Sequence, residues 1–241
     1  MELFNRASLK NFFKNGSTPS ESSFAGLIDS TINKLDDGFS KTPKDGIRLA
    51  PLGNDAKLLS FFKHIQDQQA KWDFTIDPGE TDKGLQISED SERIALFLKE
   101  GGGIGVGTRS PKYDFDVDGV FASRTRVGTY KNGQIPADGE WHVVLEKVEE
   151  IAAFECVVKA EGPDKRGKHA MALASIFVVH GRGKAHIKQS VFGWFWDRIA
   201  IRVKTNDDHS ARVEMKTRSH YGKTPDGETI QADYHMTSLW G

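Results

Sequence analysis

Two neighbouring stretches near the C-terminus alternate apolar and polar residues: Asp197-Arg-Ile-Ala-Ile-Arg-Val-Lys-Thr205 and Ala211-Arg-Val-Glu-Met-Lys-Thr-Arg-Ser219. Successive side chains of a β-strand point to opposite faces of a sheet, so this period of two predicts two strands with one buried face each. The residues between them, Asn206-Asp-Asp208, are typical of a turn. The inward-facing side chains are expected to be Ile199, Ile201, Val203, Val213 and Met215.

Similar stretches recur through residues 120–241. Further strands are predicted near Val120–Tyr130, Trp141–Leu145, Ala153–Ala160, Ala170–Val179, His186–Phe192 and Thr229–Trp240. Turn residues separate them at Lys131-Asn-Gly133, Asp138-Gly139, Glu161-Gly-Pro-Asp164, His180-Gly-Arg-Gly183 and Pro225-Asp-Gly227. About eight strands with no helical period between them predict a mainly β fold, with an antiparallel, jelly-roll-like β-sandwich in this part of the chain.

Residues 51–119 are expected to form a β-rich connector, because strands are predicted near 72–76, 84–88 and 93–98. Residues 58–69 fit either a brief helix or a strand. The run Gly101-Gly-Gly-Ile-Gly-Val-Gly107 matches neither GxGxxG nor the Walker spacing, so its glycines predict turns or close backbone crossings rather than a phosphate site. Asp114-Phe-Asp-Val-Asp-Gly119 begins like a calcium loop, but Thr125 stands where the twelfth ligand would be, which favours a half-buried strand.

Residues 1–50 carry one helix signal. Thr18-Pro19-Ser20-Glu21 offers a capping hydroxyl, a proline in the first turn and a carboxylate three residues on, which predicts a helix from Pro19 to about Leu35. Its apolar stripe consists of Phe24, Leu27, Ile28, Ile32 and Leu35. Such a stripe either packs on its own domain or joins copies of the chain in a short parallel bundle, and we expect these five residues to mediate trimerisation.

Composition excludes some classes of protein. The 241 residues include 33 Lys+Arg and 34 Asp+Glu, so a nucleic-acid binder that depends on bulk positive charge is not expected. No apolar run reaches the length of a membrane span and no export signal opens the chain, so a cytoplasmically made protein without membrane insertion is expected. The single cysteine, Cys156, lies in an apolar stretch and is expected to be a buried, inert thiol.

The sequence predicts no catalytic residues, no metal site and no cofactor. The histidines are scattered without a ligand-like spacing, no G-x-S-x-G elbow is present, and neighbouring carboxylates on a strand point apart. Instead, Val191-Phe-Gly-Trp-Phe-Trp196 holds four aromatic residues within six positions. We expect either a ligand-binding platform formed by Trp194, Trp196, Arg182 and Tyr221, or rings that fill a core and a subunit interface.

One segment carries a family resemblance. Gly103-Ile-Gly-Val-Gly-Thr-Arg-Ser-Pro111, followed by Tyr113-Asp-Phe-Asp-Val-Asp-Gly119, resembles the G-I-G-T-x-x-P-x-x-x-L-D-V-x-G segment of phage tail fibres and related trimeric appendages. Val106 and Gly107 stand inside the pattern, and Phe115 replaces its leucine. Residues 120–241 look like the C-terminal domain attached to such segments, and residues 1–50 are similar to their attachment end.

The resemblance implies a non-enzymatic homotrimer anchored to baseplate proteins of a phage tail or contractile injection system. It would be a short fibre or a cage-like extension with an intertwined β connector, and its C-terminal domain would meet a cell-surface glycan or protein, or another subunit. A stand-alone carbohydrate-binding, lectin-like module is the alternative. The sequence thus predicts three parts: a helical attachment and trimerisation segment at residues 1–50, a β-rich connector at 51–119 and a C-terminal β-sandwich domain at 120–241.

Overall fold

The computed structural model describes residues 4–34, 36–53, 55–81, 83–163 and 167–240. The protein is mainly β, with several antiparallel sheets and short helices only near its N-terminus, as the sequence predicts. It consists of two compact units, Met1–Ala122 and Ser123–Gly241. Among the described residues, no helix combines the length and apolar character needed to cross a bilayer.

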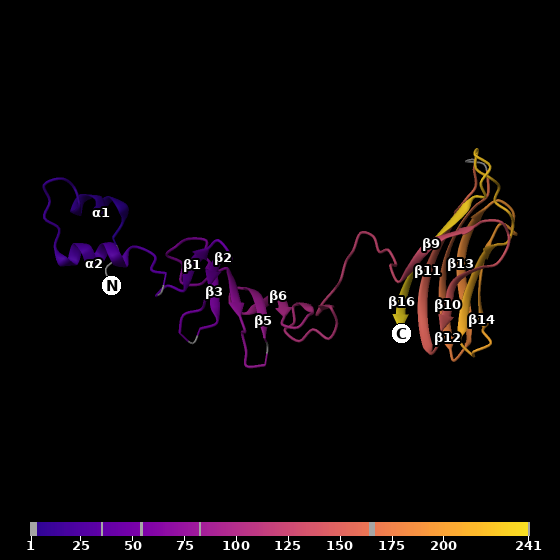
Figure 1. The fold of residues 1–241 in the computed structure, drawn as a ribbon, viewed down its shortest axis with the longest axis horizontal. Helices are drawn as coiled ribbons and strands as arrows, with labels where there is room; N and C mark the ends of the chain where they lie inside the picture. Colours follow the sequence, from indigo (N-terminus) through magenta and orange to yellow (C-terminus); the bar gives the residue numbers. More distant parts are fainter. Residues whose placement is uncertain (1–3, 35, 54, 82, 164–166, 241) are drawn as a thin grey trace. The chain divides into compact units, whose positions relative to one another are not determined.

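The C-terminal unit is a sandwich of two antiparallel sheets (Figure 1). One sheet has the order β13-β12-β11-β16-β9, and the other has the order β10-β15-β14. The bounds of the first are β9 Lys131–Pro136, β11 Ile151–Glu161, β12 His169–Val179, β13 Arg182–Phe192 and β16 Gln231–Trp240. Those of the second are β10 His142–Val148, β14 Ile199–Thr205 and β15 Ala211–Thr217.

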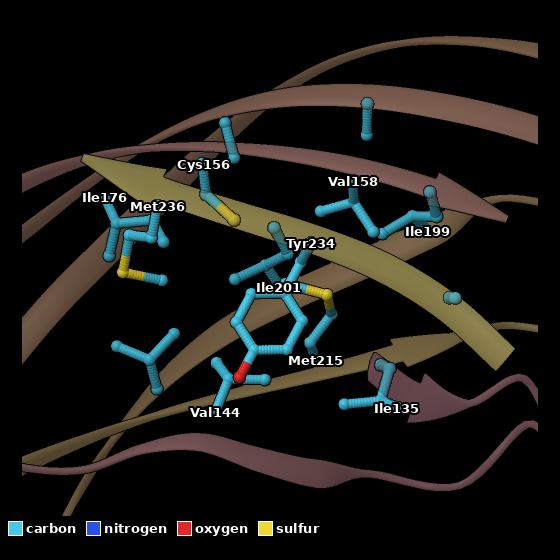
Figure 2. Close-up of a cluster of buried hydrophobic side chains, with 14 of the residues drawn as sticks. Ile135, Val144, Cys156, Val158, Ile176, Ile199, Ile201, Met215, Tyr234 and Met236 are labelled. Atoms are coloured by element: carbon cyan, nitrogen blue, oxygen red, sulfur yellow. The ribbon is translucent and has the colours of Figure 1, made fainter. Parts of the chain in front are cut away.

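The core of the sandwich lies between the two sheets, where every second residue of β11 and β12 is buried. Ile199, Ile201, Val213 and Met215 are buried and Val203 packs against them, which confirms the predicted inward residues (Figure 2). Cys156 is fully buried, and burial raises the pKa of its thiol to about 12. It therefore stays protonated and unreactive at neutral pH, as expected.

The start of this unit differs from the prediction. The prediction of a strand near Val120–Tyr130 is wrong: residues 120–129 pair with no strand. Gly128 instead lies so close to β16 that an added Cβ would be 2.5 Å from the Thr237 hydroxyl. The turn predicted at 131–133 is wrong too, since these residues begin β9 and pair with β16.

The turn between β12 and β13 is shorter than predicted. His180 and Gly181, with φ of 44° and 77°, form a two-residue connection of the kind that suits the twist of a hairpin. A Cβ on Gly181 would also lie 2.0 Å from the carbonyl oxygen of His209. Because the connection needs only two residues, β13 begins at Arg182, earlier than the predicted start at His186.

The N-terminal unit contains a six-stranded sheet in sequence order: β3 (Lys57–Phe61), β4 (Trp72–Ile76), β5 (Gly84–Glu89), β6 (Arg93–Lys99), β7 (Ile104–Val106) and β8 (Phe115–Val117). All neighbours are antiparallel except β7 and β8. The three strands predicted in this segment are confirmed, and residues 57–61 form a strand rather than the alternative helix. Gly101, Gly102, Gly103 and Gly107 have positive φ, so the glycine run forms turns as expected.

The two faces of this sheet differ sharply. One face is mainly polar and buries Asp73, Gln86 and Ser88 beside Phe97, and loop residues bond to it: Arg109 donates to Gln86, and Ser91 donates to Asp73. The cross-strand register places apolar side chains on the opposite face of all six strands. They are Leu59, Phe61, Trp72, Phe74, Ile76, Leu85, Ile87, Leu96, Leu98, Ile104, Val106, Phe115 and Val117, and we call this set the open apolar face; each is half-buried or exposed.

The helical segment is the part that the sequence predicts least well. Two helices form, α1 (Arg6–Phe12) and α2 (Glu21–Asp29), and the hairpin β1 (Phe39–Thr42) and β2 (Gly46–Leu49) follows. The cap of α2 is Ser20, which makes a capping box with Ser23; Thr18 does not cap it.

The predicted end of α2 near Leu35 is also wrong. The Ser30 hydroxyl donates to the Gly26 carbonyl and accepts from the N–H of Phe4, and such side-chain bonds compete with helical ones. The helix α1, whose cap is Asn5, is not among the elements predicted from the sequence.

Candidate functional site

An exposed aromatic turn joins β13 to β14. Trp194 and Trp196 are 69% and 49% exposed, and their rings stack with centroids 5.9 Å apart and planes 9° apart. Phe195 packs against Trp196 with centroids 4.0 Å apart. The predicted alternative in which these rings fill the core is therefore wrong for this turn. The residues form a rigid aromatic cluster on the surface, defined here as the aromatic turn.

The buried side chain of Asp197 holds the backbone of the aromatic turn in place. Its side chain is buried, accepts from the Trp194 N–H at 2.8 Å and from the Ser219 hydroxyl, and lies 3.1 Å from the Lys168 ammonium. Burial by itself raises the pKa of this carboxyl, but the hydrogen bonds and the Lys168 charge outweigh burial, so the pKa lies below its usual range. A charged Asp197 thus fixes the backbone that presents the tryptophans.

Two residues predicted for the binding platform lie elsewhere. Tyr221 is only 3% exposed and its hydroxyl donates to the Asp197 carbonyl at 2.6 Å, so it supports the aromatic turn but cannot contact a ligand. Arg182 begins β13, while Trp194 follows the end of that strand. Eleven extended residues separate two such points by about 33 Å, so Arg182 is not part of one site with the tryptophans.

The outer face of β14 and β15 is strongly basic. The register places Arg198, Arg202 and Lys204 beside Arg212, Lys216 and Arg218 on this face. Glu214 neutralises part of the charge, because Arg202 and Arg212 each donate to one of its oxygens, at 2.6 and 2.7 Å. These bonds hold the pKa of Glu214 below its usual range although burial opposes the shift.

A groove of about 730 Å³ lies between this basic face and the edge of β13. Trp196 of the aromatic turn and Trp141 line it, with Arg198, Lys216 and Arg218 as the charged lining residues. Ala185, Ile187 and Ala200 add an apolar wall. The volume falls within the range of about 300–1,000 Å³ typical of small-ligand sites, so the groove is large enough to hold a small ligand.

Sequence reasoning missed most of this groove. Of the predicted platform it contains only Trp196. Basic residues at 198, 202 and 204, with others at 212, 216 and 218, follow the same period of two as the core residues, on the opposite face. That period was available in the sequence, whereas the proximity of Trp141 depends on the pairing of β10 with β15.

Three of the five predicted trimerisation residues lie in α2, which packs against α1. Phe24 contacts Phe13 with ring centroids 5.2 Å apart but remains half exposed, and Ile28 is exposed. Ile32 is exposed beyond the end of α2, Leu27 is half-buried, and Leu35 lies outside the described residues. The single helical stripe is therefore split, and only Phe24, Leu27 and Ile28 belong to α2.

Within the described parts of the chain, no group of three His, Cys, Asp or Glu side chains converges as a metal site would require. Comparison with protein-family models finds no match to this chain, and a search of curated proteins finds no similar sequence.

Proposed function

We propose that this chain is a non-enzymatic, homotrimeric appendage of a phage tail-like particle or contractile injection system. In this proposal residues 1–122 join three copies and attach them to baseplate proteins, as a short fibre or cage-like extension. The C-terminal sandwiches then face a target surface or a neighbouring subunit. The open apolar face of the β3–β8 sheet is the observation that carries the proposal.

The proposal follows from the cost of leaving that face in water. In the described part of residues 1–122, the buried apolar side chains are those of Ala70, Phe97 and Pro111, whereas the open apolar face crosses six strands. Stable domains bury a sheet face against a second layer, and burial contributes about 25 cal/mol per Å² of apolar surface. Three copies packing these faces together would supply the missing layer.

The resemblance described above supports the trimer. The matching segment forms β7 and β8 and the loop between them, at one edge of the sheet that carries the open apolar face. Ile104, Val106, Phe115 and Val117 of this segment all belong to that face. The residues that resemble a trimeric appendage are thus the ones that would be buried between copies.

The test is the solution mass of the full chain by light scattering. The expected mass is near three times 26.8 kDa. It should fall for Leu98→Ser/Phe115→Ser and for Leu27→Ser/Ile28→Ser/Ile32→Ser. Ile65→Ser is the matched control, because Ile65 is 88% exposed in the β3–β4 loop and off the open apolar face. A folded wild-type chain with the mass of a monomer or dimer, unchanged by Leu98→Ser/Phe115→Ser, would contradict the proposal.

The groove of the C-terminal unit favours a second candidate, a stand-alone carbohydrate-binding module. It combines two tryptophans with uncommitted polar groups, which suits a sugar ligand. A monomer that binds glycan through this groove would favour the second candidate over the first.

A further inference from the structure

We infer that the groove over β14 and β15 binds an acidic glycan, one whose sugar rings carry carboxylate groups. Arg198 and Arg218 lie directly opposite each other, because the Arg218 N–H donates to the Arg198 carbonyl at 2.8 Å where the two strands begin and end. Both side chains are exposed, and neither has a carboxylate partner among the described residues. Like charges in opposite positions destabilise a sheet, and a bound oxyanion would relieve that repulsion.

The other arginines on this face are already paired with a carboxylate, which points to Arg198 and Arg218. Arg202 and Arg212 are bound to Glu214, and Arg202 also covers the ring of Trp141, 3.9 Å from its centroid. Lys216 donates to the Gly139 carbonyl at 3.1 Å and lies 5.1 Å from the centroid of the Trp141 ring, and no carboxylate among the described residues pairs with it. Arg198, Arg218 and Lys216 therefore form a three-cation end to the groove, and guanidinium groups match carboxylates in a bidentate manner.

The apolar residues of the lining indicate a ligand that is larger than a small anion. Trp196, Ile187 and Ala185 make an apolar wall beside the cations. Pyranose rings present C–H faces that pack on such walls, so a chain of sugars with an occasional carboxylate satisfies both halves of the lining. Nucleic acid fits less well, because a protein that binds it tightly can contact about six to ten phosphates, whereas the groove is lined by the three cations Arg198, Lys216 and Arg218.

The groove is held in shape without a ligand. The Gln189 side chain of β13 donates to the Ile199 carbonyl at 3.1 Å and accepts from the Ile199 N–H at 2.9 Å, which ties its two walls together. Asp197 fixes the turn that carries Trp196. A site that is already ordered loses little conformational freedom when a ligand binds.

The experiment is calorimetric titration of the full chain with hexagalacturonate, with neutral maltohexaose and single-stranded oligothymidylate as comparison probes. We expect hexagalacturonate to bind, its affinity to fall with added salt, and Arg198→Gln/Arg218→Gln to weaken it about tenfold or more. Lys204→Gln is the matched control, with an expected change under about twofold, because Lys204 lies on the same face but outside the groove.

Each outcome decides the inference. Absence of hexagalacturonate binding at millimolar concentration, equal binding of maltohexaose, or tighter binding of oligothymidylate would overturn it. If circular dichroism shows that the double variant is unfolded, Arg218→Gln alone replaces it, with an expected loss of about threefold. An unchanged affinity in that variant would also overturn the inference.

The inference deepens the proposed function and rests on it for the presence of a glycan-bearing target surface. Light scattering of the same samples separates the two. A monomer that binds hexagalacturonate would overturn the trimer and keep the site, whereas a trimer that binds none would overturn the site alone.

Discussion

Both units of this chain alternate apolar and polar residues along their strands, but the two units bury their apolar residues differently. In residues 123–241 two sheets cover each other, so residues such as Ile176 and Met236 are fully enclosed by the chain itself. In residues 57–117 a single sheet has its polar face covered by loops and its apolar face uncovered. The C-terminal unit therefore carries its own stability, whereas under the trimer proposal the N-terminal unit depends on the copies that would cover its open face.

The largest expected effect tests the self-sufficient core. Ile176→Ala should lower the free energy of unfolding of the C-terminal unit by about 2–5 kcal/mol, because it leaves a cavity between the sheets. Ile176 is fully buried, while its neighbour Phe177 is 48% exposed on the outer face of β12. Phe177→Ala is thus the matched control, and urea unfolding followed by tryptophan fluorescence compares the two. Equal losses would show that the sandwich is not closed as described.

A second prediction concerns concentration. If the open apolar face is buried between three copies, a hundredfold dilution should raise the unfolded fraction of β5 and β6 about twentyfold, by mass action. Hydrogen exchange followed by mass spectrometry of peptides from residues 84–99 measures this change. Peptides from residues 151–179 serve as the internal control, since β11 and β12 belong to the self-contained sandwich. Concentration-independent exchange in both regions would contradict the trimer.

The smallest effect concerns the support of the aromatic turn. Asp197→Asn should cost about 1 kcal/mol at pH 7, because asparagine keeps the hydrogen-bonding shape but loses the charge that pairs with Lys168. Asp226→Asn, at an exposed turn, is the control.

The pH dependence of that effect has a definite sign. The pKa of Asp197 is lowered in the folded protein. The stability it contributes is therefore fully present above its unfolded pKa of about 3.9 and is lost as the pH falls through the lower folded pKa. Thermal unfolding between pH 7 and pH 3 should show a shallower acid loss in the variant. An equally steep loss in both proteins would exclude this role for Asp197.

Sequence patterns predicted the strands best where apolar and polar residues alternate over a long stretch. The strands that contain Ile199, Ile201, Val213 and Met215 are examples, because a period of two has one structural interpretation when one face is buried. Short segments were predicted poorly. α2 stops at Asp29 because the hydroxyl of Ser30 forms local bonds that the apolar stripe of the helix does not reveal.

The residues of the candidate site are likewise predicted only in part. The aromatic turn was visible as a dense run of rings, and Trp194 and Trp196 are indeed exposed and stacked. Arg182 and Tyr221 were grouped with them because they are near in sequence or similar in chemistry. Neither criterion reports the length of β13, which places Arg182 at the far end of that strand from the tryptophans. Nor does it report the burial of Tyr221, whose hydroxyl bonds to Asp197 under the aromatic turn.

By itself, the sequence determined the mainly β class, the inward residues of the sandwich and the inert buried thiol, because local alternation and apolar context set these properties. Only the tertiary structure decided which strands are neighbours. That choice brings Arg198 opposite Arg218, places Trp141 beside β15 and leaves one face of the β3–β8 sheet open. These features join residues distant in the chain, and their energies depend on contacts that no local pattern encodes.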